Sequence, residues 1–273
     1  MVRPSTAGSR DPPCPPGWAR DTRGYCSPPI TGCFPPHVSA DVATVANATG
    51  FVSVKAFEHL GLNDDAVRAA IVAAYACTAN VFLPPAAYRF NSTVHLPNQI
   101  LLSGSSRAVG EFLTPAGAVI YAPKDGPAFQ IGPHISRVHL HDLVIEGVVT
   151  GLIIVNAALI RLTNVAVHVT HNVDGVPMSY PACGDIGCNI VFGSNNTAMV
   201  VENTYWLWVE DSTFSFLPEY DHTNYLSGAV PLEDQGMRPS VILRGSKDSY
   251  MAEVSVCYLL HFDRVTTAGG SFQ

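Results

Sequence analysis

Charged residues are scarce in this sequence. They make up only 14% of its 273 residues, whereas hydrophobic residues make up 47%. A chain this apolar and this weakly charged must bury much of its surface, which excludes an intrinsically disordered protein. Its length predicts one large domain or two small ones.

Basic residues are the scarcer of the two charge types. The chain has 15 Lys and Arg residues against 22 acidic ones, which gives a formal net charge of −7. A negative field repels phosphate backbones, so we expect no nucleic-acid partner. The same field does not attract a polyanionic polysaccharide at long range, unless a basic or calcium-loaded groove compensates for it locally.

Long apolar runs are absent, which predicts that the chain has no membrane span. The first residues, Met1-Val-Arg-Pro-Ser-Thr, also lack the apolar core of a signal peptide. Seven cysteines and three N-x-Ser/Thr acceptor sites, at Asn47, Asn91 and Asn195, nevertheless indicate the secretory route. We therefore expect a secreted or extracellular glycoprotein, with a missing leader or an incomplete gene model.

Residues 1–36 differ in composition from the rest of the chain, because proline and cysteine dominate them. Proline cannot donate to a ladder or continue a helix, so we expect neither a sheet nor a long helix there. The segment is typical of a disulfide-stapled leader or linker, followed by one domain over residues 37–273. Cys183 and Cys188 could bridge a short loop or remain unpaired. The disulfide candidates, whose pairing stays open, are Cys14, Cys26, Cys33, Cys183 and Cys188.

A helix is predicted to begin after residue 62. Asn63, Asp64 and Asp65 suit an N-cap and first turn, because their oxygens accept from free backbone N–H groups and their charge suits the helix dipole. We therefore interpret the acidic pair as structural and not as a catalytic dyad. The helix should end near residues 77–80. Its apolar face recurs at helical spacing and consists of Val67, Ala70, Ile71 and Ala74.

Strands are predicted on both sides of this helix. They cover residues 51–57, 81–83, 88–90 and 100–102, with proline-containing turns between the last three. This order resembles the N-terminal segment of the pectate-lyase superfamily, whose members act on polysaccharides. The resemblance implies an all-β fold, a right-handed parallel β-helix closed by an N-terminal capping α-helix. Leu62 and Ala86 depart from the family pattern, in turns.

A short unit of alternating apolar residues ending in a polar one recurs from residue 138 onward. Its copies start at Val138, Ile160, Leu207 and Leu260, with separations of 22, 47 and 53 residues. The first separation fits one coil of a β-helix, and each of the other two fits about two coils with insertions. Within the unit, the polar residues that follow the strand are expected to form a structural ladder rather than a catalytic group. These residues are Asp142, Asn164 and Asp211.

The repeat has its longest interruptions at residues 168–188 and 217–236. Loops at these positions would form the walls of a binding groove. Asn172-Val-Asp174-Gly175 resembles a stretch of polygalacturonases, in which the matching Asp belongs to a carboxylate cluster that activates water. The resemblance makes Asp174 and Asp185 the catalytic candidates. Ile186 departs from the family pattern, and the later motifs of that family are absent. The alternative is an ordinary Asp-Gly turn.

A lyase would require a cation on the uronate carboxylate. Calcium is the ion implied in that case, and no other cofactor is expected. The acids of the second interruption, Glu219, Asp221, Glu233 and Asp234, could supply oxygen ligands or be merely solvated. His139 and His141 alternate on one strand but lack a partner at zinc-ligand spacing, so we interpret them as surface or groove residues. The identity of any metal stays undetermined.

Aromatic side chains could stack on sugar rings at a groove edge. Trp206 and Trp208 are predicted to lie on one side of their strand and Tyr205 on the other; core packing is the alternative. His171 and Tyr220 complete the substrate-binding candidates.

The resulting hypothesis is a secreted carbohydrate-active enzyme, a hydrolase or a lyase, with a polysaccharide as its partner. The alternative is a non-catalytic β-helix that binds glycans or acts as a structural protein at the cell surface. The unpaired acids favour this alternative. No C-terminal cap is visible, which suggests a fragment of a longer protein.

Overall fold

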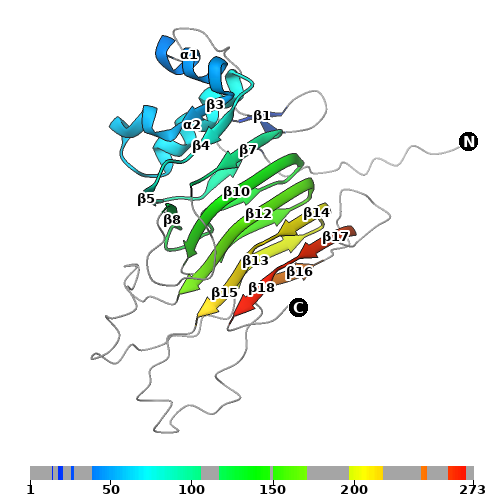
Figure 1. The fold of residues 1–273 in the computed structure, drawn as a ribbon. Helices are drawn as coiled ribbons and strands as arrows, with labels where there is room; N and C mark the ends of the chain where they lie inside the picture. Colours follow the sequence, from blue (N-terminus) through cyan, green and yellow to red (C-terminus); the bar gives the residue numbers. More distant parts are fainter. Residues whose placement is uncertain are drawn as a thin grey trace, which may run out of the picture.

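The computed structural model describes residues 14, 18–20, 26–27, 39–105, 117–147, 150–170, 197–217, 241–244 and 258–268. Strands dominate, and nearly all of them are parallel, so the expectation of a β protein is met at this level. The helices lie together at one end of the stacked strands (Figure 1). No helix in these ranges is long and apolar enough to cross a membrane.

The first helix was not predicted. Helix α1 spans Ala40–Thr49, with Ser39 as its N-cap and Gly50 in the left-handed conformation just past its end. Strand β3 follows at Phe51–Ser53, but a 3-10 segment, η1, then covers Val54–Leu60. The prediction of a strand through residue 57 was therefore wrong beyond Ser53, whose side chain accepts a hydrogen bond from the Lys55 N–H and starts the turn.

The predicted helix is confirmed as α2, Asp64–Ala76. The Asn63 side chain accepts from the backbone N–H groups of Asp65 and Ala66, at 3.1 and 3.2 Å. These bonds satisfy two donors that have no partner within the helix. All four residues of the predicted apolar face are buried. The helix packs on η1, β3 and β4 (Asn80–Phe82) at the start of the strand stack.

The first stack is a run of parallel strands in chain order (Figure 1). Its inward side chains repeat from strand to strand, so that Leu102, Leu140 and Leu162 lie opposite one another and are fully buried. Each such side chain contributes about 2 kcal/mol by burial. The members are β3, β4, β7 (Ile100–Ser103), β10 (Ile135–Gly147), β12 (Ala157–Thr170), β14 (Tyr205–Glu210) and β17 (Tyr258–Asp263).

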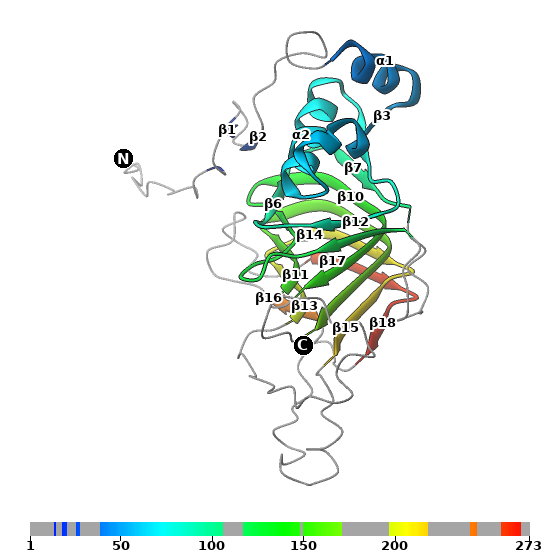
Figure 2. The same ribbon diagram turned by 90° about the vertical axis from the view of Figure 1, so that its left-hand side faces the viewer.

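Two further stacks run beside the first (Figure 2). Along the chain, β9, β10, β11, β12, β13 and β14 alternate between the first and the second stack. The second stack holds β6 (Val94–Leu96), β9 (Phe129–Ile131), β11 (Thr150–Val155), β13 (Thr197–Glu202) and β16 (Val241–Arg244). The third holds β5 (Ala86–Arg89), β8 (Ala118–Tyr121), the second halves of β10 and β12, β15 (Thr213–Leu217) and β18 (Thr266–Ala268).

The register confirms the sequence repeat. Val138 lies opposite Ile160, Ile160 opposite Leu207, and Leu207 opposite Leu260. Because the last two pairs are direct neighbours, separations of 47 and 53 residues each correspond to one step along the stack. The expectation of two coils for each was wrong, since chain inserted between neighbouring strands lengthens the spacing without adding a strand to the stack.

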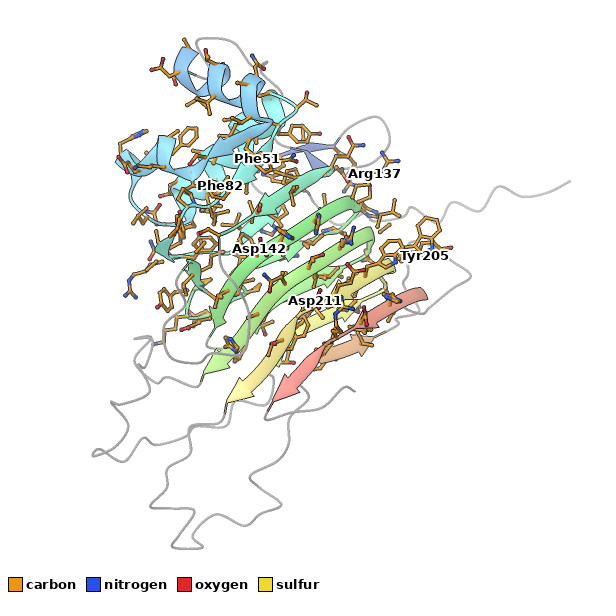
Figure 3. All side chains as sticks on the ribbon, viewed as in Figure 1. Phe51, Phe82, Arg137, Asp142, Tyr205 and Asp211 are labelled. Atoms are coloured by element: carbon orange, nitrogen blue, oxygen red, sulfur yellow. The ribbon has the colours of Figure 1, made fainter. Side chains whose placement is uncertain are left out.

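The polar residues that end the repeat unit form a corner ladder: Asp142, Asn164, Asp211 and Arg264. All four have positive φ, at 53°, 53°, 49° and 49°. At Asp142 and Asn164 the long strands β10 and β12 bend from the first stack into the third. Asn164 Nδ2 donates to Asp142 Oδ1 at 2.5 Å. Asp142 and Asp211 lie at the same end of β10 and β14, and Arg137 and Tyr205 lie at the opposite end of these two strands (Figure 3).

The described parts of the leader include one short sheet. Strands β1 (Ala19–Arg20) and β2 (Cys26–Ser27) pair antiparallel, so the expectation of no sheet in residues 1–36 was wrong. Trp18 is partly buried against the core of the domain. Cys14 and Cys77 are both disulfide-bonded. Cys77 was not among the predicted disulfide cysteines, because its position at the end of a helix gave no such signal.

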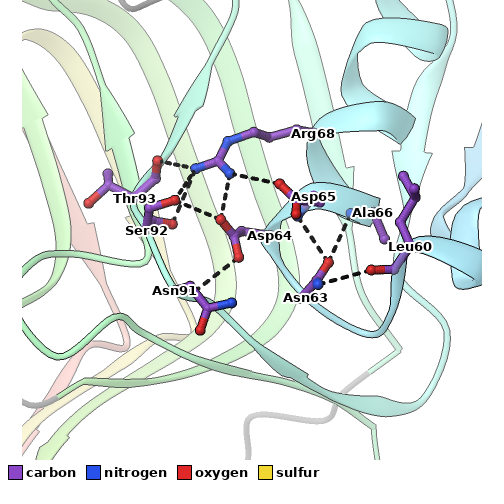
Figure 4. Close-up of polar contacts among 9 residues, drawn as sticks. All are labelled: Leu60, Asn63, Asp64, Asp65, Ala66, Arg68, Asn91, Ser92 and Thr93. Carbon is purple, nitrogen blue, oxygen red and sulfur yellow. Dashed lines mark hydrogen bonds and ion pairs between the residues drawn. The ribbon is translucent and has the colours of Figure 1, made fainter.

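A buried acid joins α2 to the turn at residues 91–93 (Figure 4). Asp64 is only 2% exposed. It accepts from the Asn91 N–H at 3.0 Å, from Ser92 Oγ at 2.7 Å and from Arg68 Nη1 at 2.5 Å. Arg68 also donates to the Thr93 carbonyl at 2.8 Å. Asp64 therefore has a structural role, as the interpretation of the acidic pair requires.

Candidate functional site

The outward side of the first stack carries a grid of mainly polar and aromatic side chains, which we name the polar face. Its residues alternate along each strand with apolar ones that are buried in β7 to β14 and partly buried in β17, and neighbouring strands place them in register about 4.8 Å apart. One column holds Leu101, His139, Arg161, Trp208 and His261, and the other holds Ser103, His141, Thr163, Glu210 and Asp263.

Side chains on the polar face form hydrogen bonds and ion pairs across neighbouring strands. His139 Nε2 lies 3.1 Å from Thr163 Oγ1, and Arg161 Nη2 donates to Glu210 Oε2 at 2.7 Å. The rings of His139 and His141 meet edge to face, with centroids 5.6 Å apart. His141 Nδ1 lies 3.4 Å from Ser103 Oγ and 3.1 Å from Asp142 Oδ2. The face is therefore a connected polar surface.

Burial and neighbouring charge shift the pKa values of two residues of the polar face, one in each column. Burial lowers the pKa of His139 to about 4, assisted by the charge of Arg161. His139 is accordingly neutral at pH 7, with one donor and one acceptor nitrogen. The hydrogen bond from Arg161 lowers the pKa of Glu210, which stays a carboxylate.

The corner ladder borders the polar face. Arg264 donates to Asp211 Oδ2 at 2.9 Å and to Asp263 Oδ2 at 2.6 Å. The hydrogen bond from Arg264 lowers the pKa of Asp211. These pairs hold β14 and β17 together at their outer edge, and the hydrogen bonds from Arg264 favour the ionised form of Asp211.

The predicted placement of the aromatic residues is corrected by the backbone. Trp208 lies on the polar face, between Arg161 and His261. Trp206 has a φ of 55°, which breaks the alternation of the strand, and it falls outside the paired register. Its ring centroid lies 4.8 Å from that of Tyr205, so the two rings are in contact and do not point to opposite sides.

A second row of ionisable side chains crosses the third stack: Arg89, Tyr121, Glu146 and His168, in register on successive strands. Arg89 Cζ lies 4.9 Å from the centre of the Tyr121 ring. Burial raises the pKa of Glu146 and lowers that of His168. Burial, and then the charge of Glu146, raises the pKa of Tyr121. Arg89 is exposed and the other three side chains are partly buried, so the row is only in part screened from water.

The spacing of the sequence repeat indicates part of this row. Glu146 and His168 each stand eight residues after a repeat start, at Val138 and Ile160. Equal offsets from in-register positions predict that the two side chains are neighbours. The neighbouring column of the same strands, Val119, Val144 and Ala166, is buried as a small cluster of its own, with Tyr121 against it.

Most predicted site residues fall outside the described ranges. This holds for the catalytic candidates Asp174 and Asp185, for His171 and Tyr220, and for the four acids considered as calcium ligands. It also holds for Asn195, Cys33, Cys183 and Cys188. Asn47, in α1, and Asn91, in the turn after β5, are both exposed. Among the described residues, no three His, Cys, Asp or Glu side chains are grouped to hold a metal ion.

Comparison with known proteins gives little further information. No family model and no curated protein matches the chain. One solved structure that is similar is ORF18 of Geobacillus virus E2, with 15% sequence identity and a TM-score of 0.37. The similarity covers 83% of this chain and 52% of that one, so the chain spans about half the length of the viral protein.

Proposed function

We propose that this chain is a right-handed parallel β-helix protein of the pectate-lyase superfamily that binds a polysaccharide along its polar face. The fold part of the proposal is supported by parallel strands that alternate between stacks in chain order, and by left-handed corners that recur at the same register. It is also supported by the position of α2 at the start of the stack, as expected for a capping helix.

The observation that carries the proposed function is the register of the polar face. Five successive strands offer hydroxyl, imidazole, guanidinium and carboxylate groups in two straight columns, with Trp208 among them. The columns extend for about 19 Å, four strand spacings. A polymer with regularly spaced hydroxyl groups matches such a repeat, and an aromatic ring gives its sugar faces an apolar contact.

Glycan binding is tested by screening the purified chain against immobilised plant, algal and microbial polysaccharides. We expect retention of at least one polymer, weakened by His261→Ala on the polar face. The control is His59→Ala, since His59 is an exposed histidine of η1 at the other end of the molecule. Equal weakening by both variants, or no retention by any polymer, would contradict the proposal.

Catalysis is a second candidate function, favoured by the partly buried Glu146 and His168 of the row on the third stack. A half-buried Glu146 with a raised pKa beside His168 has the character of a general acid paired with a neutral base. Asp174 and Asp185 stay the candidates from the family resemblance, and calcium would be needed for elimination but not for hydrolysis.

The catalytic hypothesis is tested by following new reducing ends and unsaturated uronates together, with and without calcium. Reducing ends alone would indicate a hydrolase, and both signals a lyase. Glu146→Gln should abolish the activity if this row is catalytic. If Asp174→Asn leaves the activity intact, the assignment of Asp174 is wrong.

A further inference from the structure

Both arginines of the polar face and its corner ladder are already held by carboxylates. Arg161 donates to Glu210 at 2.7 Å. Arg264 donates to both oxygens of Asp211 and, at 2.6 Å, to Asp263. An incoming anion would therefore have to displace a carboxylate that belongs to the same surface before it could reach either guanidinium group.

Two histidines of the columns already contact neighbouring side chains. His139 bonds with Thr163, and its burial, together with the charge of Arg161, lowers its pKa. His141 Nδ1 lies 3.1 Å from Asp142 Oδ2, so this nitrogen already faces a carboxylate. His261 lies one strand from Trp208, and its charge acts on the carboxylate of Glu210.

The formal charge of this surface is negative. The polar face and the corner ladder together hold four carboxylates and two guanidinium groups, so their formal charges sum to minus two. The carboxylates are Asp142, Glu210, Asp211 and Asp263, and the guanidinium groups are Arg161 and Arg264. The chain inserted between the strands of this face does not reverse that balance. Residues 171–196 contain no Lys or Arg, and residues 218–240 contain one Arg and four acids.

We propose that the polymer bound on the polar face is an uncharged polysaccharide and not a polyuronate. This inference rests on the proposed function and narrows its substrate class. Hydroxyl groups can both donate to Glu210 and Asp263 and accept from Thr163 and His139 without breaking any ion pair. A carboxylated polymer would meet net repulsion on the same surface, and its carboxylates could reach a guanidinium group only by displacing Glu210, Asp211 or Asp263.

The experiment is affinity gel electrophoresis of the whole chain in a series of polymers. The neutral probes are xyloglucan, galactomannan, arabinan and mixed-linkage β-glucan, and the uronate probes are polygalacturonate and alginate. We expect a neutral polymer to retard the protein, with little change when the salt is raised about tenfold, and uronates to bind at least about 10-fold more weakly. Tighter binding of a uronate than of every neutral polymer would overturn the inference alone. Binding of neither class would overturn the proposed function as well.

A variant that removes one carboxylate from the polar face provides a second test of this inference. Glu210→Gln releases Arg161 and should raise uronate binding several-fold, in a manner that salt weakens, because a free guanidinium binds carboxylates in pairs of hydrogen bonds. Glu58→Gln is the matched control, since Glu58 is an exposed glutamate of η1 away from the face, and it should change nothing. If Glu210→Gln leaves uronate binding at the wild-type level, the ion pair does not set the substrate class and the inference is wrong.

Discussion

At the scale of single residues, Asp64 shows how a helix start becomes part of the fold. Burial raises its pKa, but the hydrogen bonds from the Asn91 N–H, Ser92 and Arg68 outweigh that effect, and the net pKa is lowered. Three donors on two different segments thus favour the charged form of one buried carboxylate. Its stabilising contribution depends on ionisation.

Asp64→Ala should lower the free energy of unfolding by about 3 kcal/mol at pH 7, because it leaves Arg68 and Ser92 without their acceptor.

The contribution of the ionised Asp64 is present above the unfolded pKa of about 3.9 and is lost as the pH falls through the lower folded value. Urea denaturation of wild type and Asp64→Asn from pH 7 to pH 2.5 should therefore show converging stabilities. Asp65→Asn is the control, since Asp65 is 68% exposed and should cost less than about 0.5 kcal/mol. A difference that stays constant with pH would contradict this account.

Gly132 provides a second test at this scale. It has a φ of 110°, and a Cβ at this position would overlap the carbonyl oxygen of Val155. Gly132→Ala should cost more than about 2 kcal/mol of stability. Gly50 also has a positive φ, 73°, but nothing lies within 4 Å of its Cβ position, so Gly50→Ala should cost only about 1 kcal/mol. Thermal unfolding of both variants measures the difference, and equal losses would show that the close approach at Gly132 is not limiting.

At the scale of elements, the corner ladder explains why β10 and β12 change stack at the same register. A left-handed residue turns the strand, and asparagine and aspartate tolerate that conformation better than most residues. The hydrogen bond between Asn164 and Asp142 then joins one corner to the next.

Two variants of Asn164 separate these effects. Asn164→Ala loses the hydrogen bond and strains the backbone, whereas Asn164→Gly loses the same bond but relieves the strain. We expect the alanine variant to be less stable than the glycine variant by about 1 kcal/mol, measured by urea denaturation. The role of the left-handed corner would be refuted if the alanine variant were as stable as the glycine variant.

The features that could be predicted from the sequence have a pattern within one segment or repeat the same pattern in several segments. Helix α2 was predictable because the cap at Asn63 and the apolar face lie within one short segment. The repeat was predictable because stacking demands the same inward pattern at Val138, Ile160, Leu207 and Leu260. The number of strand-to-strand steps between successive copies could not be predicted, because chain inserted between strands changes the spacing in the sequence without adding a step. The Glu146–His168 neighbourhood follows from equal offsets in two repeat copies only once their register is known. The left-handed conformation of Trp206 depends on where its strand bends, so neither feature is encoded in one segment.

At the scale of the whole molecule, the helices cover the first strands while the polar face extends over the strands that follow, from β7 to β17 (Figure 1). Shared register makes this face continuous, because every strand adds one residue to each column. A ligand that spans the columns should therefore lose affinity when any central rung is altered.

Calorimetric titration of the neutral polysaccharide that the wild-type chain retains tests the central claim most directly. Trp208→Ala removes the aromatic side chain from the fourth of the five strands of the polar face, and it should weaken binding at least about 10-fold, as the loss of one aromatic contact implies. Tyr75→Ala removes an aromatic residue of α2, away from the face, and should leave the affinity unchanged. Wild-type affinity in Trp208→Ala, or an equal loss in Tyr75→Ala, would contradict the assignment of glycan binding to the polar face.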